Sequence, residues 1–305
     1  MKTIDKKLSI FLVLLLVVTM VSSCNSSKYA QTDTLIISAK SLTGYIGADN
    51  VVIIDMQSAN DYAARHVPGA VNITKADIVV NEPVSNMLAP ASTIEQVLGS
   101  KGISNDTTIV VYDSDNMSAS RMVWTLFMYG DQNVKLVDGG IKAIQSAGIE
   151  VTKEVPTQTP ATFRASYDPQ WLATKEDVLQ QVNNPDANVI LLDVRTNDEY
   201  VQSGKVPSSV MFDYYDNFYA DGTFKDTQTT QINYLKAEIR PENDIILYCQ
   251  TSMRAAAVFV RLYDAGYRNL KVYDGAYAEW VLDPSDPVVF PDTTTTVTPS
   301  QQDAS

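Results

Sequence analysis

The stretch IILYCQTSMRAAAVFVRLYDAGY, residues 245–267, holds the pattern from which the fold can be predicted. Its apolar and β-branched residues run up to Tyr248 and are typical of a strand buried in a parallel sheet. Cys249 and a few polar residues come next, and Arg254 then begins an apolar run of helical length that ends at Gly266. This order of strand, loop and helix places Cys249 at the carboxyl end of a strand, where open parallel sheets bind ligands.

The same pattern occurs earlier in the chain. Residues 109–140, IVVYDSDNMSASRMVWTLFMYGDQNVKLVDGG, align without a gap with residues 245–276, at a constant offset of 136 residues. The alignment pairs Asp113 with Cys249. Two copies of one long unit indicate a duplication into tandem domains of the same fold.

A second pair of segments precedes the first in each copy. Residues 51–73 and 189–212 each open with an apolar strand-like run, closed by Asp55 and by Asp193 respectively. Segments of helical length, such as residues 174–182, lie between the strand-like runs. This alternation predicts an α/β fold with two tandem domains, each an open parallel sheet with helices on both faces.

The predicted organisation follows from these repeats and from shifts in composition. It comprises a signal peptide at 1–23, a tether at 24–32, a first domain at 33–150, a proline-containing linker at 151–165, a second domain at 166–290 and a low-complexity, disordered tail at 291–305. We expect the second domain to be catalytic and the first to be non-catalytic, because Asp113 stands at the cysteine position.

The N-terminal segment has the layout of an export signal. Residues 1–7 carry three lysines, and residues 8–21 form an apolar run that is too short for a comfortable membrane span. The sequence Val-Ser-Ser-Cys that ends at Cys24 resembles a bacterial lipobox, whose cysteine is lipidated and becomes the new N-terminus. We therefore expect an exported protein anchored to a bacterial membrane through Cys24, on a periplasmic or cell-surface face. The alternative is an ordinary signal peptide with an incidental cysteine.

The net charge and the small numbers of cysteine and histidine residues argue against several classes of function. The chain has 23 Lys and Arg against 36 Asp and Glu, which argues against a nucleic-acid partner. Cys24 and Cys249 are the only cysteines, so lipidation of Cys24 leaves no intrachain disulfide. His66 is the only histidine, which excludes a His-rich metal site and a Cys–His dyad unless His66 reaches Cys249. We expect neither a metal nor a cofactor.

The loop after the strand that ends at Tyr248 has features that favour the binding of an anion. Its backbone amides can curl round the sulfur, and the helix that follows directs its positive end at it, which stabilises a thiolate and any anion attached to it. Arg254 adds a positive charge that can bind an oxyanion through two hydrogen bonds. The alternative is an inert buried cysteine at the end of a core strand. The predicted loop residues are Gln250, Thr251, Ser252, Met253 and Arg254.

Together these motifs resemble the rhodanese family of sulfurtransferases, in its two-domain thiosulfate and 3-mercaptopyruvate forms. The matching stretches are LLDVRTNDEY at 191–200, YCQTSMRAA at 248–256 and VYDGAYAEWVLDPSDPV at 272–288, with HVPGAVNI at 66–73 in the first copy. The resemblance implies that the Cys249 thiolate takes a sulfane sulfur from a small anionic donor and holds it as a persulfide. Cyanide or a thiol then accepts the sulfur.

The resemblance also implies roles for residues outside the loop. Arg195 matches an arginine that helps to bind the anionic donor in thiosulfate enzymes. Structural roles are expected for Asp55, Asp113, Asp193, Asp274, Glu279, Trp280 and His66. Ser252 departs from the family, which usually has glycine there, and a positive φ at that position would be costly for serine. The loop is nearer the thiosulfate type than the mercaptopyruvate type, which favours thiosulfate as donor.

Two other functions compete with sulfur transfer. The related C-x5-R loop of phosphatases and arsenate reductases has one more residue between cysteine and arginine than Cys249 and Arg254 have here. A tighter ring fits a sulfur atom better than a tetrahedral phosphate. The other alternative is a non-catalytic, lipid-anchored sulfur carrier or binding module whose loop is impaired by Ser252.

Overall fold

The computed structural model describes residues 34–291. Both copies of the repeat lie in one compact unit that begins at Leu35. The predicted signal peptide, the tether with Cys24, and residues 292–305 of the predicted tail fall outside the described residues. Within the described part of the chain, no helix is long and apolar enough to span a lipid bilayer.

The first repeat is built on a five-stranded sheet with the order β1-β7-β6-β2-β3, in which neighbouring strands are parallel. A separate antiparallel pair, β4 and β5, forms what we call the β4–β5 ribbon. The elements are β1 (Ile36–Ile37), η1 (Ala39–Gly44), β2 (Val51–Asp55), α2 (Ala59–Ala64), β3 (Val71–Asn72), η2 (Lys75–Asp77), β4 (Val79–Val80), β5 (Met87–Leu88), α3 (Ala91–Ser100), β6 (Thr108–Tyr112), α4 (Met117–Met128), β7 (Val134–Val137) and α5 (Gly140–Ser146).

The second repeat has an equivalent sheet, with the order β10-β9-β11-β12-β8 and parallel neighbours throughout. The two orders correspond strand for strand under the sequence alignment, which confirms the α/β fold predicted from the duplication. The elements are η3 (Pro169–Trp171), β8 (Leu172–Ala173), α6 (Lys175–Asn183), β9 (Val189–Asp193), α7 (Asn197–Ser203), β10 (Val210–Met211), η4 (Tyr214–Asn217), α8 (Thr227–Lys236), β11 (Asp244–Tyr248), α9 (Met253–Asp264), β12 (Leu270–Tyr273) and α10 (Ala276–Trp280).

Local sequence explains where the helices begin and end. The side chain of Thr174 accepts a hydrogen bond from the backbone N–H of Asp177, whose carboxylate accepts from the N–H of Thr174, so a capping box starts α6. The helix α9 ends just before Gly266, whose φ of 98° lies in the region that favours glycine. Residues 153–168 contain neither helix nor strand. The linker at 151–165 stays a prediction.

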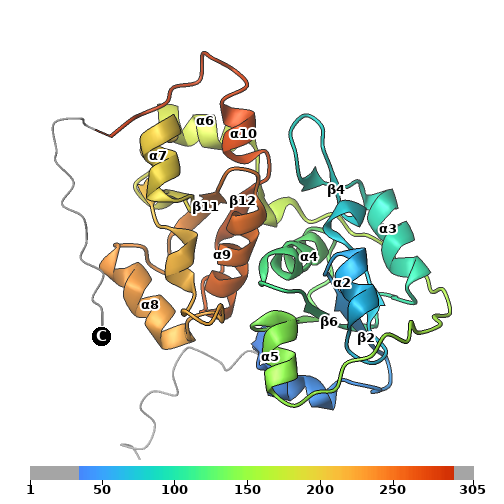
Figure 1. The fold of residues 1–305 in the computed structure, drawn as a ribbon. Coiled ribbons are helices and arrows are strands. Elements are labelled where there is room, and N and C mark those ends of the chain that lie inside the picture. The colour runs from blue at the N-terminus through green and yellow to red at the C-terminus, as the bar shows by residue number, and fades with distance from the viewer. Residues whose placement is uncertain (1–33, 292–305) are drawn as a thin grey trace, which may run out of the picture. The chain divides into compact units, whose positions relative to one another are not determined.

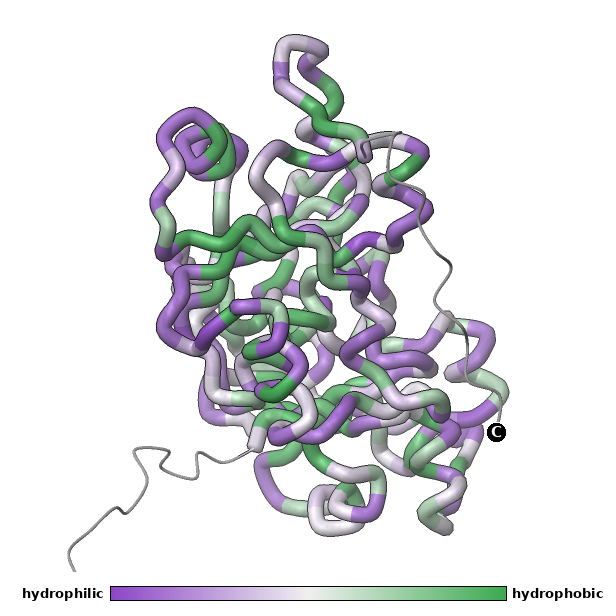
Figure 2. Tube along the Cα trace, turned by 90° about the vertical axis from the view of Figure 1, so that its left-hand side faces the viewer, coloured by the Kyte–Doolittle hydropathy of each residue, from purple (hydrophilic) through white to green (hydrophobic). Residues whose placement is uncertain are grey.

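The two sheets share a central core. Helices α4 and α9 pack side by side between them (Figure 1), and ten of the twelve residues of α4 are buried, as expected for a helix that is apolar on most of its faces. The rings of Phe127 and Phe259 meet edge to face at 5.7 Å, and Trp171 packs against both. The remaining face of each sheet carries its own smaller cluster. Figure 2 shows hydrophobic stretches running through the interior and hydrophilic ones in the outer loops.

Candidate active site

Cys249 lies where the sequence predicted it, directly after β11 and just ahead of α9. Its thiol is free, and the residue is only 1% exposed. Ser252, the residue before α9, has a left-handed backbone with φ of 62°. The positive φ that would be costly for serine is therefore present at this position, and serine rather than glycine adopts it here.

Two carbonyls at the start of the loop are bound by the helix that follows β12. The N–H groups of Tyr277 and Ala278, in α10, donate to the carbonyl oxygens of Cys249 and Gln250 at 3.0 and 3.1 Å. Across residues 34–291, the backbone hydrogen bonds include no acceptor for five N–H groups of the loop and first helical turn, those of Gln250, Thr251, Ser252, Arg254 and Ala255. These donors are available to an anion that enters the loop.

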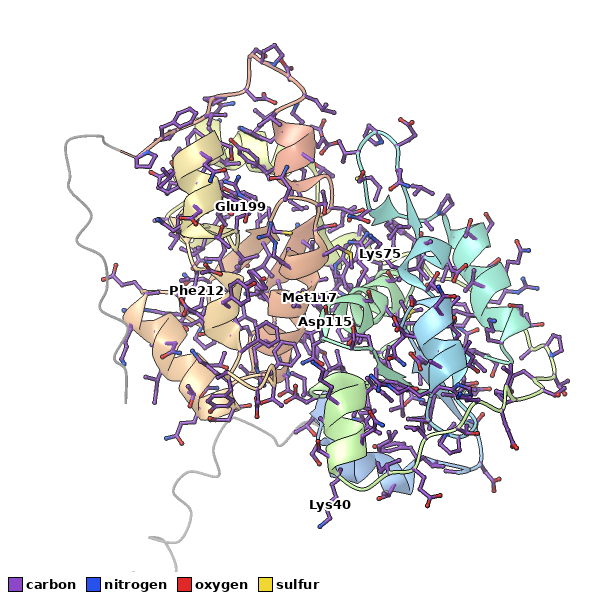
Figure 3. The ribbon with its side chains drawn as sticks, in the orientation of Figure 1. Lys40, Lys75, Asp115, Met117, Glu199 and Phe212 are labelled. Atoms are coloured by element: carbon purple, nitrogen blue, oxygen red, sulfur yellow. The ribbon has the colours of Figure 1, made fainter. Side chains whose placement is uncertain are left out.

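The corresponding loop of the first repeat shows what these amides bind. Asp113 follows β6 as Cys249 follows β11, and its carboxylate accepts hydrogen bonds from the N–H groups of Asp115 (3.1 Å), Asn116 (2.6 Å) and Ala119 (2.9 Å). Under the 136-residue offset these donors are the counterparts of Thr251, Ser252 and Ala255, whose N–H groups are among those without a backbone acceptor in the second repeat. In Figure 3, Asp115 lies at the start of α4, where the two repeats meet. The duplicated loop is thus a cradle for an anion.

Arg254 brings a positive charge to the Cys249 loop. Its two terminal nitrogens bind the two carboxylate oxygens of Glu199, at 2.5 and 2.7 Å, and its guanidinium lies 5.3 Å from the centre of the Tyr214 ring. Burial lowers the pKa of Arg254, but its hydrogen bonds to Glu199 and the adjacent Cys249 sulfur raise it above its usual value. Arg254 is therefore positively charged beside the Cys249 sulfur, and its two terminal nitrogens are already bound to the Glu199 carboxylate.

Glu199 is a site residue that the sequence analysis did not single out. Burial alone would raise the pKa of Glu199, but hydrogen bonds from Arg254 and Thr196 lower it to about 2. It lies in the first turn of α7, on the second repeat (Figure 3), and its carboxylate also accepts from the backbone N–H of Thr196. The sequence Thr-Asn-Asp-Glu at 196–199 is a capping-box signature. It reveals the helix start but not the partner 55 residues away.

Arg195 is placed away from the sulfur loop. Its side chain is fully buried and binds the carboxylate of Asp193 through Nε and Nη2, with Nη2 also donating to the carbonyl of Gly204 at 2.7 Å. Its guanidinium stacks on the Tyr277 ring at 3.7 Å. A donor-binding role for Arg195 stays a prediction, and none of these contacts supports it.

The residues expected to be structural have structural contacts. Both ring nitrogens of His66 lie within hydrogen-bond distance of backbone carbonyls, those of Tyr62 and Glu154, and the ring stacks on Tyr62. His66 therefore forms no dyad with Cys249. Asp193 accepts from the backbone N–H of Arg195 and so closes the loop after its strand, as expected.

Two clefts of the described residues lie away from Cys249. A cleft of about 630 Å³ lies at the amino ends of β9, β11 and β12, the edge of the sheet opposite to the sulfur. Another, of about 590 Å³, lies between the Asp113 loop and residues 214–222 and is lined by Tyr214, Tyr215, Phe218 and Tyr219. Because Arg254 packs on Tyr214, this aromatic cleft lies next to the Arg254–Glu199 pair.

Comparisons with known proteins agree with this geometry. The thiosulfate sulfurtransferase of Corynebacterium glutamicum is 28% identical over 265 residues, which cover 80% of this chain and 87% of that protein. The sulfur carrier protein TtuD of Thermus thermophilus is 29% identical and covers 72% of this chain and 83% of its own length. The crystal structure of the 3-mercaptopyruvate enzyme SseA from Escherichia coli superposes with a TM-score of 0.73 at 22% identity, over 80% of this chain and 99% of that one.

The family model for the rhodanese-like domain matches the chain twice, at residues 38–147 and 174–283. The two matches fall on the two sheets described above and include both the Asp113 loop and the Cys249 loop. Together they cover more than half of the sequence. The chain therefore belongs to the rhodanese family and carries two rhodanese-like domains in tandem.

Proposed function

We propose that this protein is a sulfurtransferase that carries sulfur on Cys249. The observation that carries the proposal is the correspondence between the two loops: the amides that bind the Asp113 carboxylate in the first repeat have counterparts after Cys249 that lack a backbone acceptor. Relatives named as thiosulfate sulfurtransferases support the class. Thiosulfate is the favoured donor, 3-mercaptopyruvate is the second candidate, and cyanide or a thiol is the acceptor.

The proposed reaction has two balanced steps. In the first, the Cys249 thiolate attacks the outer sulfur of thiosulfate, a sulfur–sulfur bond forms, and sulfite leaves with the electron pair of the bond that breaks. The product is a Cys249 persulfide anion, and the loop amides and Arg254 stabilise its charge. In the second step cyanide attacks the outer sulfur, leaves as thiocyanate and restores the thiolate.

We further propose that Cys24 is lipidated and anchors the protein to a bacterial membrane. The support is the Val-Ser-Ser-Cys sequence after a short apolar run. Intact mass of protein isolated from membranes tests this, because lipidation adds acyl mass at Cys24 and removes residues 1–23. A Cys24→Ser variant recovered in the same membrane fraction, with the same mass shift, would overturn the proposal.

The decisive test of sulfur transfer uses a Cys24→Ser background, in which Cys249 is the only cysteine. The protein is incubated with thiosulfate or with 3-mercaptopyruvate, and intact mass is recorded before and after cyanide is added. We expect one sulfur atom to be gained and then released as thiocyanate, and no gain when Cys249→Ser is added. A phosphate monoester serves as the control substrate for the phosphatase alternative.

The outcomes separate the candidate functions. Sulfur gained without release to cyanide or to a small thiol favours the sulfur-carrier alternative, for which TtuD is a named relative. Absence of sulfur from both donors overturns the sulfurtransferase proposal. Hydrolysis of the phosphate monoester, dependent on Cys249, would favour the phosphatase alternative.

A further inference from the structure

The first repeat places a buried guanidinium against the sulfur loop of the second. Arg121, in α4, is fully buried, and its Nη1 lies 2.8 Å from the Asp274 carboxylate and 2.9 Å from the Ser252 hydroxyl. Its Nη2 donates to the carbonyl of Asn86 at 2.7 Å, and Trp124 lies beneath the guanidinium at 4.4 Å. A buried charge is retained only when paired, so these contacts fix the relative positions of the groups they join.

Ser252 is the residue of the loop that Arg121 contacts. Its left-handed φ of 62° is more costly for serine than for glycine, because serine has a Cβ atom. Its hydroxyl accepts from Arg121 and lies 2.9 Å from Asp274 Oδ1, so it has polar partners on both sides. Glycine at this position would offer Arg121 no side chain, and the departure from the family thus creates a contact.

The β4–β5 ribbon completes the same contact region. The backbone N–H of Leu88 donates to Asp274 Oδ2 at 2.7 Å, and the side-chain amide of Asn86 donates to the Thr251 hydroxyl at 2.9 Å. Asp274 therefore has both carboxylate oxygens engaged by the first repeat, although the sequence suggested only an architectural role within its own domain. Two successive loop residues, Thr251 and Ser252, are held from the other repeat.

In the first repeat, asparagine instead of serine adopts the left-handed conformation, and its side chain makes similar contacts. Asn116, the counterpart of Ser252, has a φ of 67°, and its side-chain amide donates both to Asp138 and to the carbonyl of Gly222. Under the 136-residue offset, Asp138 corresponds to Asp274 and Arg121 to Ala257, while Gly222, like Asn86, supplies a backbone carbonyl from the other repeat. One asparagine in the first repeat makes the contacts that serine and arginine share in the second.

From these contacts we propose that Arg121 is a positioning residue for sulfur transfer, supplied by the non-catalytic repeat. It holds Ser252 in its left-handed conformation, and through it the amides that bind the persulfide. The inference rests on the proposed function, since it assigns the first repeat a role in the chemistry of Cys249. It predicts that the loop geometry depends on a side chain 131 residues from Ser252 in sequence.

The test compares three variants with the parent chain in the Cys24→Ser background. Arg121→Ala removes the guanidinium, and Arg121→Ala with Ser252→Asn rebuilds the arrangement of the first repeat. Arg261→Ala is the matched control, because Arg261 is a buried arginine on α9 that pairs with Asp264 instead of the loop. The readouts are the rate of sulfur loading from thiosulfate, the lifetime of the persulfide by intact mass, and the free energy of unfolding.

We expect Arg121→Ala to lower the loading rate and the persulfide lifetime about 10-fold, the effect of losing one charge-assisted hydrogen bond. The added Ser252→Asn should recover a large part of that loss, whereas Arg261→Ala should lower stability and leave both sulfur readouts within about 2-fold of the parent chain. Equal losses in Arg121→Ala and Arg261→Ala, or no recovery in the double variant, would overturn the inference. If the parent chain loads no sulfur, the proposed function itself fails.

A milder variant keeps the test decisive if Arg121→Ala does not fold. Asn86→Gly retains the carbonyl that accepts from Arg121 and tolerates the φ of 68° at this position, but it removes the amide that holds Thr251. A folded Asn86→Gly protein should lose persulfide lifetime by about 3-fold. An unchanged lifetime in that folded variant contradicts the role of the first repeat.

Discussion

The Asp113 loop and the Cys249 loop present the same amides to differently charged surroundings. Burial, with the charge of Asp115, raises the pKa of Asp113 to about 7, although three backbone N–H groups oppose that rise. In the second repeat Arg254 stands at the position of Ser118 in the first. The comparison teaches that three amides alone do not compensate a buried negative charge in this loop, so an anionic sulfur needs the nearby cation as well.

The largest predicted effect is a pH-dependent loss of stability caused by Asp113. Its folded-state pKa of about 7 lies above the ordinary value of 3.8, so the folded protein retains a proton that the unfolded chain has released. The stabilising contribution is present at low pH and is lost as pH rises through about 7. Between pH 5 and pH 8 the parent chain should lose about 3 kcal/mol more free energy of unfolding than Asp113→Asn. Urea unfolding at the two pH values measures the difference.

Ser118→Arg sharpens the same prediction. It gives the first repeat the cation that the second repeat has at Arg254, so the pKa of Asp113 should fall and the pH dependence should flatten. Ser118→Gln is the uncharged control of similar length. Parallel pH profiles for the parent chain and Asp113→Asn would show that Asp113 titrates near its ordinary value, and the amides would then suffice.

The comparison also shows what the sequence could and could not predict. The strand before Cys249 and the helix at residues 174–182 are local patterns, and each was predicted from the residues alone, as was the duplication. The pairing of Arg254 with Glu199 and of Arg121 with Ser252 spans 55 and 131 residues. Such pairs depend on how the sheets and helices pack, which no local pattern encodes.

The next prediction removes the cation from the second loop. Arg254→Met should lower kcat/KM for thiosulfate by roughly 10- to 100-fold, because it deletes a charge-assisted contact to the anionic donor and to the persulfide. Thiocyanate formation at several donor concentrations measures the loss. Arg254→Lys keeps the charge but not the fork, and should retain intermediate activity. Unchanged kcat/KM in Arg254→Met would mean that the amides alone stabilise the anion.

The smallest predicted effect concerns the carboxylate that occupies Arg254. An anionic donor must share the guanidinium with Glu199, which stays ionised at assay pH because its pKa is about 2. Glu199→Gln removes the charge yet keeps a residue suited to the capping box of α7, so KM for thiosulfate should fall about 2- to 5-fold with little change in kcat. The matched control is Asp198→Asn, which removes an exposed charge from the same helical turn. An equal fall in KM in both variants would indicate general electrostatic attraction, and a rise in Glu199→Gln would mean that Glu199 orients Arg254 for the donor.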